Sequence, residues 1–400
     1  MSVEQPSERL SIRSSEIDRT PAWGAPLSYR RFRLPHLART RSTAVVYCEG
    51  NFGAVDGKTA NGLIRHSEKY EILSVIDSKK SGLDSGAVLD NKPNGVPICV
   101  DLAGAIAVAG HVPDFFIFGI APASGMLSPA ERRAILEAME HGMHIVSGLH
   151  EFLNDDPEFA AAKTAHNVTI FDVRRPRHKK DLRTFTGRIS TVTCPRIAVL
   201  GTDCAIGKRT TATILTRALN EIGIKAVLVG TGQTSLIQGA RYGVALDATP
   251  SQFCAGEMES TMLEAFAGDR PDVIIVEGQG ALSHPAYLTS GFILRGSQPQ
   301  AVILQHAPAR GTRVDFADMP MPTPVTEINL IETFSDTKVI GLTINHEHMT
   351  DAEVSAAITL YEFELNIPTT DALTRSPGRL VEMVLAAFPE LQPDIAALTA

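Results

Sequence analysis

The sequence predicts an α/β protein with two domains, a Rossmann-like parallel-sheet domain followed by a P-loop NTPase-like α/β domain. From Thr43 onward short apolar runs alternate with helical stretches, a pattern typical of parallel sheets that bind ligands at the carboxyl ends of their strands. The apolar run Ile197–Leu200 enters the loop Gly201–Lys208, which has the form Gly-x4-Gly-Lys and opens into a helical pattern. The length of 400 residues, 44% of them hydrophobic, suffices for two cores.

The overall charge and the cysteines exclude several classes of protein. A net charge of -8 argues against a surface that binds nucleic acid or an anionic membrane. The five cysteines are scattered without a C-x2-C pair, so neither a disulfide framework nor a zinc ribbon is expected. No apolar run approaches the length of a membrane span, and no export signal precedes the first domain. We therefore expect a cytoplasmic protein without nucleic-acid or membrane partners.

Residues 1–40 are polar and contain scattered arginine and proline, so we expect an extension that is partly disordered. The Rossmann-like domain is expected over residues 41–175. Ser128, followed by Pro129, predicts a helix that continues to Glu140. The strands expected in this domain are Ala44–Cys48, Ile72–Ile76, Pro97–Val100, Phe115–Ile120, Ile145–Ser147 and Val168–Phe171.

The first domain carries a loop of its own, Glu49–Gly62, between a strand and a helix. It contains Gly-Lys-Thr, but only three residues separate Gly53 from Gly57, so it is neither a phosphate-binding loop nor a Gly-x-Gly-x-x-Gly motif. Asp77 ends the second strand, where Rossmann domains place an acid that binds ribose. A dinucleotide site and an ordinary strand–helix turn both stay open here.

A linker is expected over residues 176–195, and the second domain over residues 196–400. The basic stretch Arg174–Lys180 at this junction is interpreted as a solvated linker in preference to a nucleic-acid contact, because the protein is acidic. The elements expected in the second domain are strands at Ile197–Leu200, Ala226–Val229, Val273–Val276, Ala301–Leu304 and Val339–Ile344, and helices at Lys208–Ile222, Glu257–Ala267, Asp351–Glu364 and Pro377–Phe388.

The loop at Gly201–Thr211 predicts an anion-binding site. Its glycines let backbone N–H groups turn inward, the following helix contributes partial positive charge, and Lys208 adds an ammonium group. Arg209 stands where a serine or threonine would hold magnesium, so the loop is expected to bind a phosphorylated ligand, but nucleotide hydrolysis does not follow. The expected cofactor-binding residues are Gly201, Thr202, Asp203, Cys204, Ala205, Ile206, Gly207, Lys208, Arg209, Thr210 and Thr211.

Cys204 has two interpretations. The helix that follows the loop would lower the pKa of its thiol and make a nucleophile conceivable, whereas a small residue that only fills the loop is the interpretation we prefer. The pair His346 and His348 resembles two metal ligands, but no third ligand of suitable spacing is evident. The sequence therefore leaves the metal content unknown.

Further polar residues follow the strands of the second domain. Glu277 ends a buried strand beside the expected position of the loop, and His284 follows seven residues later, so we expect this pair to handle protons. Arg295, His306 and Arg310 are expected to bind the substrate, and an arginine could grip a carboxylate with two hydrogen bonds. A surface salt bridge is the alternative for Arg310.

Three motifs together resemble the D-glutamate N-acetyltransferase family, long catalogued as a domain of unknown function. They are the loop Gly201–Thr211, the run from Glu277 to Pro285, and Gly57–Arg65 in the first domain. The resemblance covers about residues 43–390 and implies an enzyme of D-amino-acid catabolism. It would transfer an acetyl group from acetyl-CoA to the amine of D-glutamate. We also expect a homo-oligomer. The N-terminal extension is longer than this family needs.

Two other functions stay open. The loop also resembles that of dethiobiotin synthetase, in which threonine follows the lysine, so an ATP- and magnesium-dependent ligase or kinase is an alternative, with Glu277 and Asp203 organising the metal. A non-catalytic, nucleotide-responsive binding protein is a further alternative. Coenzyme A carries a pyrophosphate and a 3′-phosphate, so it suits the loop as well as ATP does. The residues alone leave open the amino acid, its chirality, the number of subunits and any ligand of the first domain.

Overall fold

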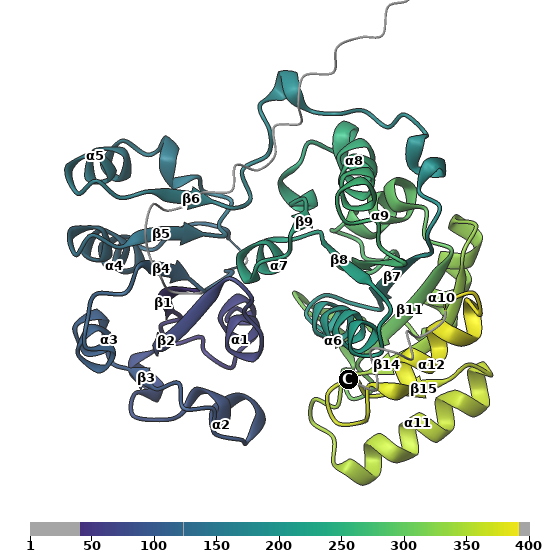
Figure 1. Ribbon diagram of the computed structural model, residues 1–400. Coiled ribbons are helices and arrows are strands. Elements are labelled where there is room, and N and C mark those ends of the chain that lie inside the picture. The colour runs from purple at the N-terminus through teal and green to yellow at the C-terminus, as the bar shows by residue number, and fades with distance from the viewer. Residues whose placement is uncertain (1–40, 123, 392–400) are drawn as a thin grey trace, which may run out of the picture. The chain divides into compact units, whose positions relative to one another are not determined.

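The computed structural model describes residues 41–122 and 124–391, so the extension expected over residues 1–40 lies outside the described residues. Within the described ranges the chain forms two α/β units, each built on a parallel sheet with helices packed against it (Figure 1). The predicted fold class is confirmed.

The first sheet has the strand order β3-β2-β1-β4-β5-β6, and every neighbouring pair is parallel. The order reverses between β1 and β4, as it does in Rossmann domains. Its strands are β1 (Ser42–Tyr47), β2 (Tyr70–Ile76), β3 (Ile98–Cys99), β4 (Phe115–Phe118), β5 (His144–Ser147) and β6 (Ile170–Asp172). Its helices are α1 (Lys58–Arg65), α2 (Ser85–Asp90), α3 (Leu102–Ala109), α4 (Pro129–Glu140) and α5 (Pro157–Ala165).

The second sheet has the order β15-β14-β11-β7-β10-β8-β9, again with parallel neighbours. Its strands are β7 (Arg196–Gly201), β8 (Ala226–Gly230), β9 (Tyr242–Gly243), β10 (Val273–Glu277), β11 (Ala301–His306), β14 (Lys338–Ile344) and β15 (Thr369–Thr370). A separate hairpin joins β12 (Thr312–Arg313) and β13 (Phe316–Pro320). The helices are α6 (Lys208–Glu221), α7 (Gln233–Gln238), α8 (Ser251–Asp269), α9 (Thr289–Ser297), α10 (Pro324–Phe334), α11 (Asp351–Leu365) and α12 (Gly378–Ala387).

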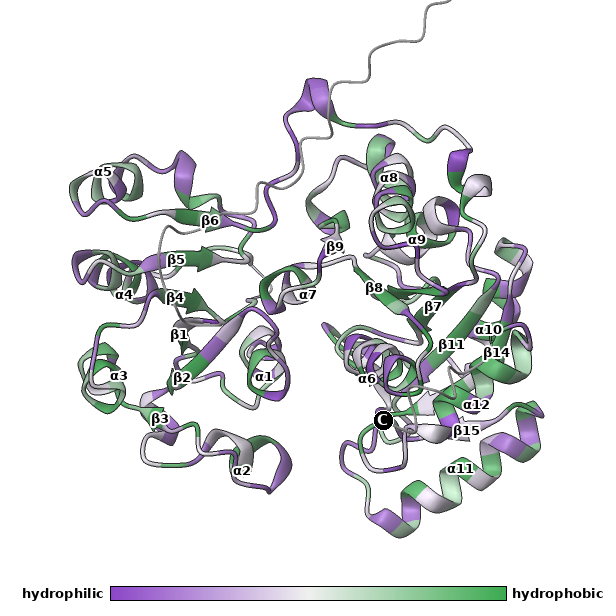
Figure 2. Ribbon diagram, in the orientation of Figure 1, coloured by the Kyte–Doolittle hydropathy of each residue, from purple (hydrophilic) through white to green (hydrophobic). Residues whose placement is uncertain are grey.

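The strands lie in apolar cores because helices cover the two sheets. Every residue of β7, β10 and β11 is buried, which explains why these strands appear in the sequence as continuous apolar runs. Figure 2 shows hydrophobic colours along the central strands, whereas α11 alternates between hydrophobic and hydrophilic residues along its length. The buried sheet therefore fixes the positions of the polar loops at its strand ends.

Local capping signals explain why several helices begin where they do. Ser128 accepts a hydrogen bond from the backbone of Glu131, and Glu131 returns one to the backbone of Ser128, so the expected start of α4 is confirmed. Helix α8 begins at Ser251, earlier than the expected Glu257. Helices α9 and α10 and the β12–β13 hairpin were not predicted. Pro324, directly after the capping residue Thr323, is the signal that could have revealed α10.

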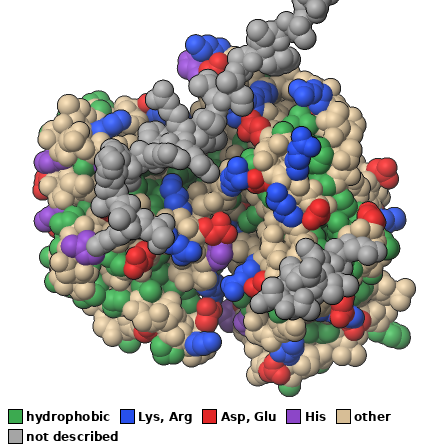
Figure 3. Space-filling model, viewed as in Figure 1, with side chains coloured by type: hydrophobic (Ala, Val, Ile, Leu, Met, Phe, Trp, Pro, Cys, Tyr) green, Lys and Arg blue, Asp and Glu red, His purple; other side chains and the backbone are tan. Residues whose placement is uncertain are grey.

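Within the described ranges, no helix combines the length and the apolar character needed to span a bilayer. On the face in Figure 3, Lys and Arg side chains are interspersed with Asp and Glu side chains. This agrees with the composition of the sequence, which contains both basic and acidic residues.

We predict that Gly278→Ala lowers the free energy of unfolding by about 1–3 kcal/mol, because a methyl group at this position would collide with the backbone carbonyl of Val199 in β7. Urea denaturation of the parent and the variant measures the change. Gly311→Ala is the matched control, since among the described residues no heavy atom lies within 4 Å of a Cβ built there. Equal destabilisation by both substitutions would contradict the packing argument.

Candidate functional site

The Gly201–Thr211 loop follows β7, which lies between β10 and β11, so it meets the carboxyl ends of its neighbours. Ala205 and Gly207 have φ values of 49° and 103°, and these left-handed conformations turn the chain into α6. Lys208 is buried, and its Nζ donates a hydrogen bond to the carbonyl of Asp203. Burial lowers the pKa of the Lys208 ammonium group. The loop thus has the backbone form and the buried cation expected of an anion site.

Arg310 holds this loop in place. Its Nη1 lies 3.1 Å from Oδ2 of Asp203 and donates to the carbonyl of Cys204 over 2.9 Å. Its other nitrogens grip the carboxylate of Glu347 over 2.7 and 3.0 Å. Arg310 was expected to bind substrate, but the structure engages its guanidinium in positioning the loop.

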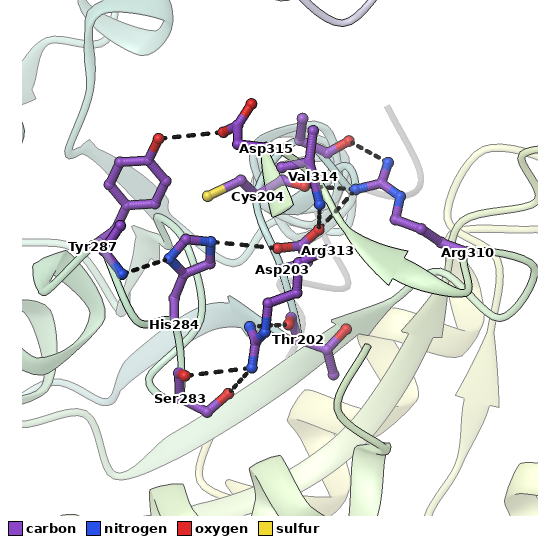
Figure 4. Close-up of polar contacts among 12 residues, drawn as sticks. Thr202, Asp203, Cys204, Ser283, His284, Tyr287, Arg310, Arg313, Val314 and Asp315 are labelled. Carbon is purple, nitrogen blue, oxygen red and sulfur yellow. Dashed lines mark hydrogen bonds and ion pairs between the residues drawn. The ribbon is translucent and has the colours of Figure 1, made fainter. Parts of the chain in front are cut away.

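The β12–β13 hairpin contributes two contacts that the sequence did not predict (Figure 4). The backbone N–H of Val314 donates to Oδ2 of Asp203 over 2.7 Å. Arg313 donates to the Ser283 hydroxyl over 2.8 Å and to the carbonyl of Thr202. The hairpin therefore connects the Gly201–Thr211 loop with the segment that carries His284.

Arg209 lies beside Glu277. Its Nε donates to the Ser235 hydroxyl over 2.9 Å and lies 3.8 Å from Oε1 of Glu277. The other oxygen of Glu277 accepts a hydrogen bond from the backbone of Thr231 over 2.8 Å. Both side chains of this pair are largely buried, since 15% of the Arg209 side chain and 6% of the Glu277 side chain are exposed. The carboxylate expected to direct a metal or move a proton is thus paired with a guanidinium.

His284 is fixed on all sides in a buried position. Its ring stacks on Tyr287 with centroids 4.5 Å apart and meets the edge of Phe316 at 5.6 Å. Its Nδ1 accepts a hydrogen bond from the backbone of Ala286 over 3.2 Å, and its Nε2 lies 3.7 Å from Oδ1 of Asp203. Burial lowers the pKa of the imidazole although Asp203 raises it, so the ring is neutral at neutral pH.

The segment that carries His284 is anchored by Glu327, a buried residue of α10 that sequence reasoning missed. Its carboxylate accepts hydrogen bonds from the backbone of Leu282 and from the backbone and hydroxyl of Ser283. None of the hydrogen bonds or ion pairs among residues 41–122 and 124–391 joins Glu277 to His284. Within the described residues, the two side chains expected to handle protons therefore make no direct polar contact with each other.

Two other residues expected to bind substrate make contacts within the protein. His306 is buried, with its Nδ1 2.9 Å from the Thr202 hydroxyl and its ring against the edge of Tyr361. Arg295 is exposed on α9, where its guanidinium stacks over Phe334 at 4.4 Å. The sequence did not indicate these contacts, because a pattern in the chain does not show which way a side chain points.

The structure also gives the contacts of two residues whose roles the sequence left open. Both oxygens of Asp77 accept backbone hydrogen bonds, from Gly50, Lys79 and Phe52, so this buried carboxylate closes a turn. His346 pairs with Asp371 over 2.6 Å.

Among the described residues, Asp203, Cys204 and His284 form the group whose ligand atoms come close enough for a metal, within 4.8 Å of one another. Burial raises the pKa of the Cys204 thiol, so it is protonated at neutral pH, which disfavours a thiolate nucleophile or ligand.

Comparisons with known proteins agree with these two domains. A family model described as a P-loop domain of unknown function (DUF1611_C) matches residues 183–381, and one described as a Rossmann-like domain of unknown function (DUF1611_N) matches residues 78–176. A crystal structure of a DUF1611 family protein from Anabaena variabilis has a TM-score of 0.79 at 29% identity and covers 86% of this chain and 100% of its own.

Two of the curated relatives are named for the same activity. A D-glutamate N-acetyltransferase of Tritonibacter scottomollicae is 31% identical over 280 residues, which cover 68% of this chain and 80% of that protein. A D-glutamate N-acetyltransferase of a Pseudoalteromonas species is 32% identical over 265 residues, which cover 64% of this chain and 77% of that protein. These matches confirm the family resemblance that the motifs indicated.

We predict that His306 makes the fold sensitive to acid. Burial lowers its pKa to about 4 in the folded protein, whereas the unfolded value is about 6.5. As the pH falls from about 6.5 toward 4, the unfolded chain binds a proton that the folded chain does not, and up to about 3 kcal/mol of stability is lost. The His306→Gln variant should lose less stability than the parent between pH 7 and 5, measured by urea denaturation. Parallel pH profiles would contradict this role.

Proposed function

Because the chain belongs to the two-domain DUF1611 family, in which relatives of similar sequence are named D-glutamate N-acetyltransferases, we propose that it transfers an acetyl group from acetyl-CoA to the amine of D-glutamate. The names of the two relatives support N-acetyl transfer as the reaction class. D-Glutamate as acceptor and acetyl-CoA as donor are the specific part of this proposal.

The observation that favours acetyl transfer over the ATP-dependent alternative is the ion pair between Arg209 and Glu277. P-loop enzymes that transfer phosphoryl groups hold magnesium with a hydroxyl after the lysine and an acid at a neighbouring strand end. Here the guanidinium of Arg209 lies 3.8 Å from that acid. A dication beside it would be repelled, so the residues do not fit magnesium. Acetyl transfer from a thioester needs no metal.

The contacts of His284 suggest a role different from the one its position in the sequence indicated. Because Nδ1 accepts a hydrogen bond from the backbone of Ala286, the neutral ring carries its proton on Nε2. His284 is therefore a hydrogen-bond donor toward the site and not a base. A donor at this point would stabilise the negative charge that develops on the acetyl oxygen when the amine attacks. Glu277 balances the charge of Arg209 in this proposal and takes no part in proton transfer.

We predict that acetyl transfer proceeds without a divalent metal. After treatment with EDTA, the rate of N-acetyl-D-glutamate formation should stay within about twofold of the untreated rate, because no phosphoryl group is transferred. Release of free coenzyme A gives the rate. Loss of activity in EDTA with recovery in magnesium, or formation of ADP from ATP in the presence of D-glutamate, would favour the ligase or kinase.

We predict that the two substitutions of His284 differ. His284→Ala should lower kcat by about 10²–10³-fold, the usual cost of one oxyanion donor, with acetyl-CoA affinity nearly unchanged. His284→Gln places an amide N–H near the position of Nε2 and should retain most of the parent rate. If His284 were a base, the glutamine variant would be as slow as the alanine variant, because an amide accepts no proton.

A further inference from the structure

Two buried polar atoms face each other beside the loop without a hydrogen-bond partner. Oδ1 of Asp203 and Nε2 of His284 lie 3.7 Å apart, and neither side chain is exposed. Figure 4 shows the His284 ring directing this nitrogen toward the carboxylate. A separation of 3.7 Å is too long for a hydrogen bond. Because an unpaired buried polar group costs free energy, these two atoms are candidates for contacts with a ligand.

The surroundings fix what each atom offers. Oδ2 of Asp203 is engaged by Arg310 and Val314, which leaves Oδ1 as a free acceptor. The backbone of Ala286 occupies Nδ1 of His284, which leaves Nε2 as a donor. A metal ion would need a lone pair on Nε2, so the nearness of Cys204 does not make this a metal site.

One donor and one acceptor at this spacing match an amine that attacks a carbonyl group. In the tetrahedral intermediate the nitrogen and the oxygen are bonded to the same carbon. The N–H can donate to Oδ1 of Asp203, while the oxygen, which gains negative charge, accepts from Nε2 of His284. The free carboxylate also attracts the ammonium form of the amine before reaction.

The position of Asp203 also restricts what the loop can hold. Asp203 belongs to the Gly201–Thr211 loop, whose buried Lys208 and α6 N-terminus favour an oxyanion. In coenzyme A the long pantetheine arm separates the phosphates from the thioester, so phosphates in the loop would carry the acetyl group away from Asp203. In an amino acid, a carboxylate lies close to the amine. Both ligands offer oxyanions, but only the amino acid places one beside a reacting amine.

We propose that Asp203 and His284 hold the reacting amine and the acetyl carbonyl, and that the loop holds a carboxylate of the same amino acid. This assignment rests on the acetyl transfer proposed above, and it replaces the expectation that the loop binds the phosphates of coenzyme A. The ammonium group first loses one proton to solvent. As the N–C bond forms and the C–S bond breaks, a second proton passes from nitrogen to Oδ1 of Asp203 and then to the departing thiolate of coenzyme A.

The test compares D-glutamate with glutarate, the same dicarboxylate without the amine, by calorimetry in the presence of coenzyme A. In Asp203→Asn the amide oxygen can still accept from Arg310 and Val314 in place of Oδ2, whereas the amide nitrogen in place of Oδ1 accepts nothing from an amine. This variant should weaken D-glutamate about ten- to a hundredfold and weaken glutarate much less. Lys208→Ala should weaken both ligands by a similar factor. Neither substitution should change the affinity for coenzyme A.

Two control variants separate these effects from general damage. In Lys225→Ala, the lost lysine also donates to a backbone carbonyl, that of Asp269, but it lies outside the loop. In Glu347→Gln, Arg310 loses its other carboxylate while Asp203 keeps its own. Lys225→Ala should bind D-glutamate as the parent does. Glu347→Gln loosens the loop without changing Oδ1 of Asp203, so any weakening should be the same for D-glutamate and glutarate. Melting temperatures show whether each variant is folded.

Each remaining outcome has one meaning. If Asp203→Asn weakens glutarate as much as D-glutamate, the carboxylate only supports the loop, and the amine site is overturned. If Lys208→Ala weakens coenzyme A and spares D-glutamate, the loop holds phosphates and the carboxylate assignment is overturned. If D-glutamate binds as expected but is never acetylated, the proposed function fails while the binding site stands. Acetylation of D-glutamate with unchanged affinity in both variants would overturn the site and leave the function.

Discussion

The ion pair between Arg310 and Asp203 determines the form of the Gly201–Thr211 loop. Arg310 reaches the Asp203 carboxylate and the carbonyls of Cys204 and Ala205, and Glu347 holds the guanidinium from the other side. Arg310 follows β11, and Glu347 follows β14, so the loop after β7 is tied to the ends of two further strands of the sheet. Removing one partner of such a largely buried pair leaves an uncompensated charge, which typically costs about 3–5 kcal/mol.

This ion pair uses only half of Asp203. One oxygen serves the loop, and the other faces His284 with no partner. The two oxygens of Asp203 differ in this way because the β12–β13 hairpin brings the backbone N–H of Val314 to the same oxygen that Arg310 contacts. A carboxylate fixed in this way cannot rotate to satisfy both oxygens within the protein, so its free oxygen remains available for a ligand. Positioning and binding are thus separate tasks of a single side chain.

The features that the sequence predicted depend on neighbouring residues. The buried strands appear as apolar runs, the cap of α4 lies within four residues, and the Gly201–Lys208 loop needs only its own glycines and lysine. The fold class and the form of the Gly201–Lys208 loop follow from such local patterns.

The rest of the site depends on contacts between residues far apart in the chain. Arg310 and Asp203 are separated by 107 positions, and Val314 and Asp203 by 111, so no spacing rule connects them. The ion pair between Arg209 and Glu277 likewise joins residues far apart in the chain, so the sequence did not indicate the partner of Glu277. The sequence indicates His284 as a candidate, but the proposed role depends on one backbone N–H at Ala286, which decides where the ring carries its proton. Such directions are set by tertiary packing, and a single sequence does not record them.

The guanidinium beside Glu277 has a consequence for how the site passes through a reaction cycle. A magnesium ion enters with its nucleotide and leaves with the product, so the charge of an ordinary P-loop changes at every turnover and depends on the supply of metal. Arg209 is attached to the chain by covalent bonds, and its charge persists at any physiological pH. The loop therefore meets each incoming anion in the same electrostatic state. Ligand exchange then needs no metal to be loaded or released.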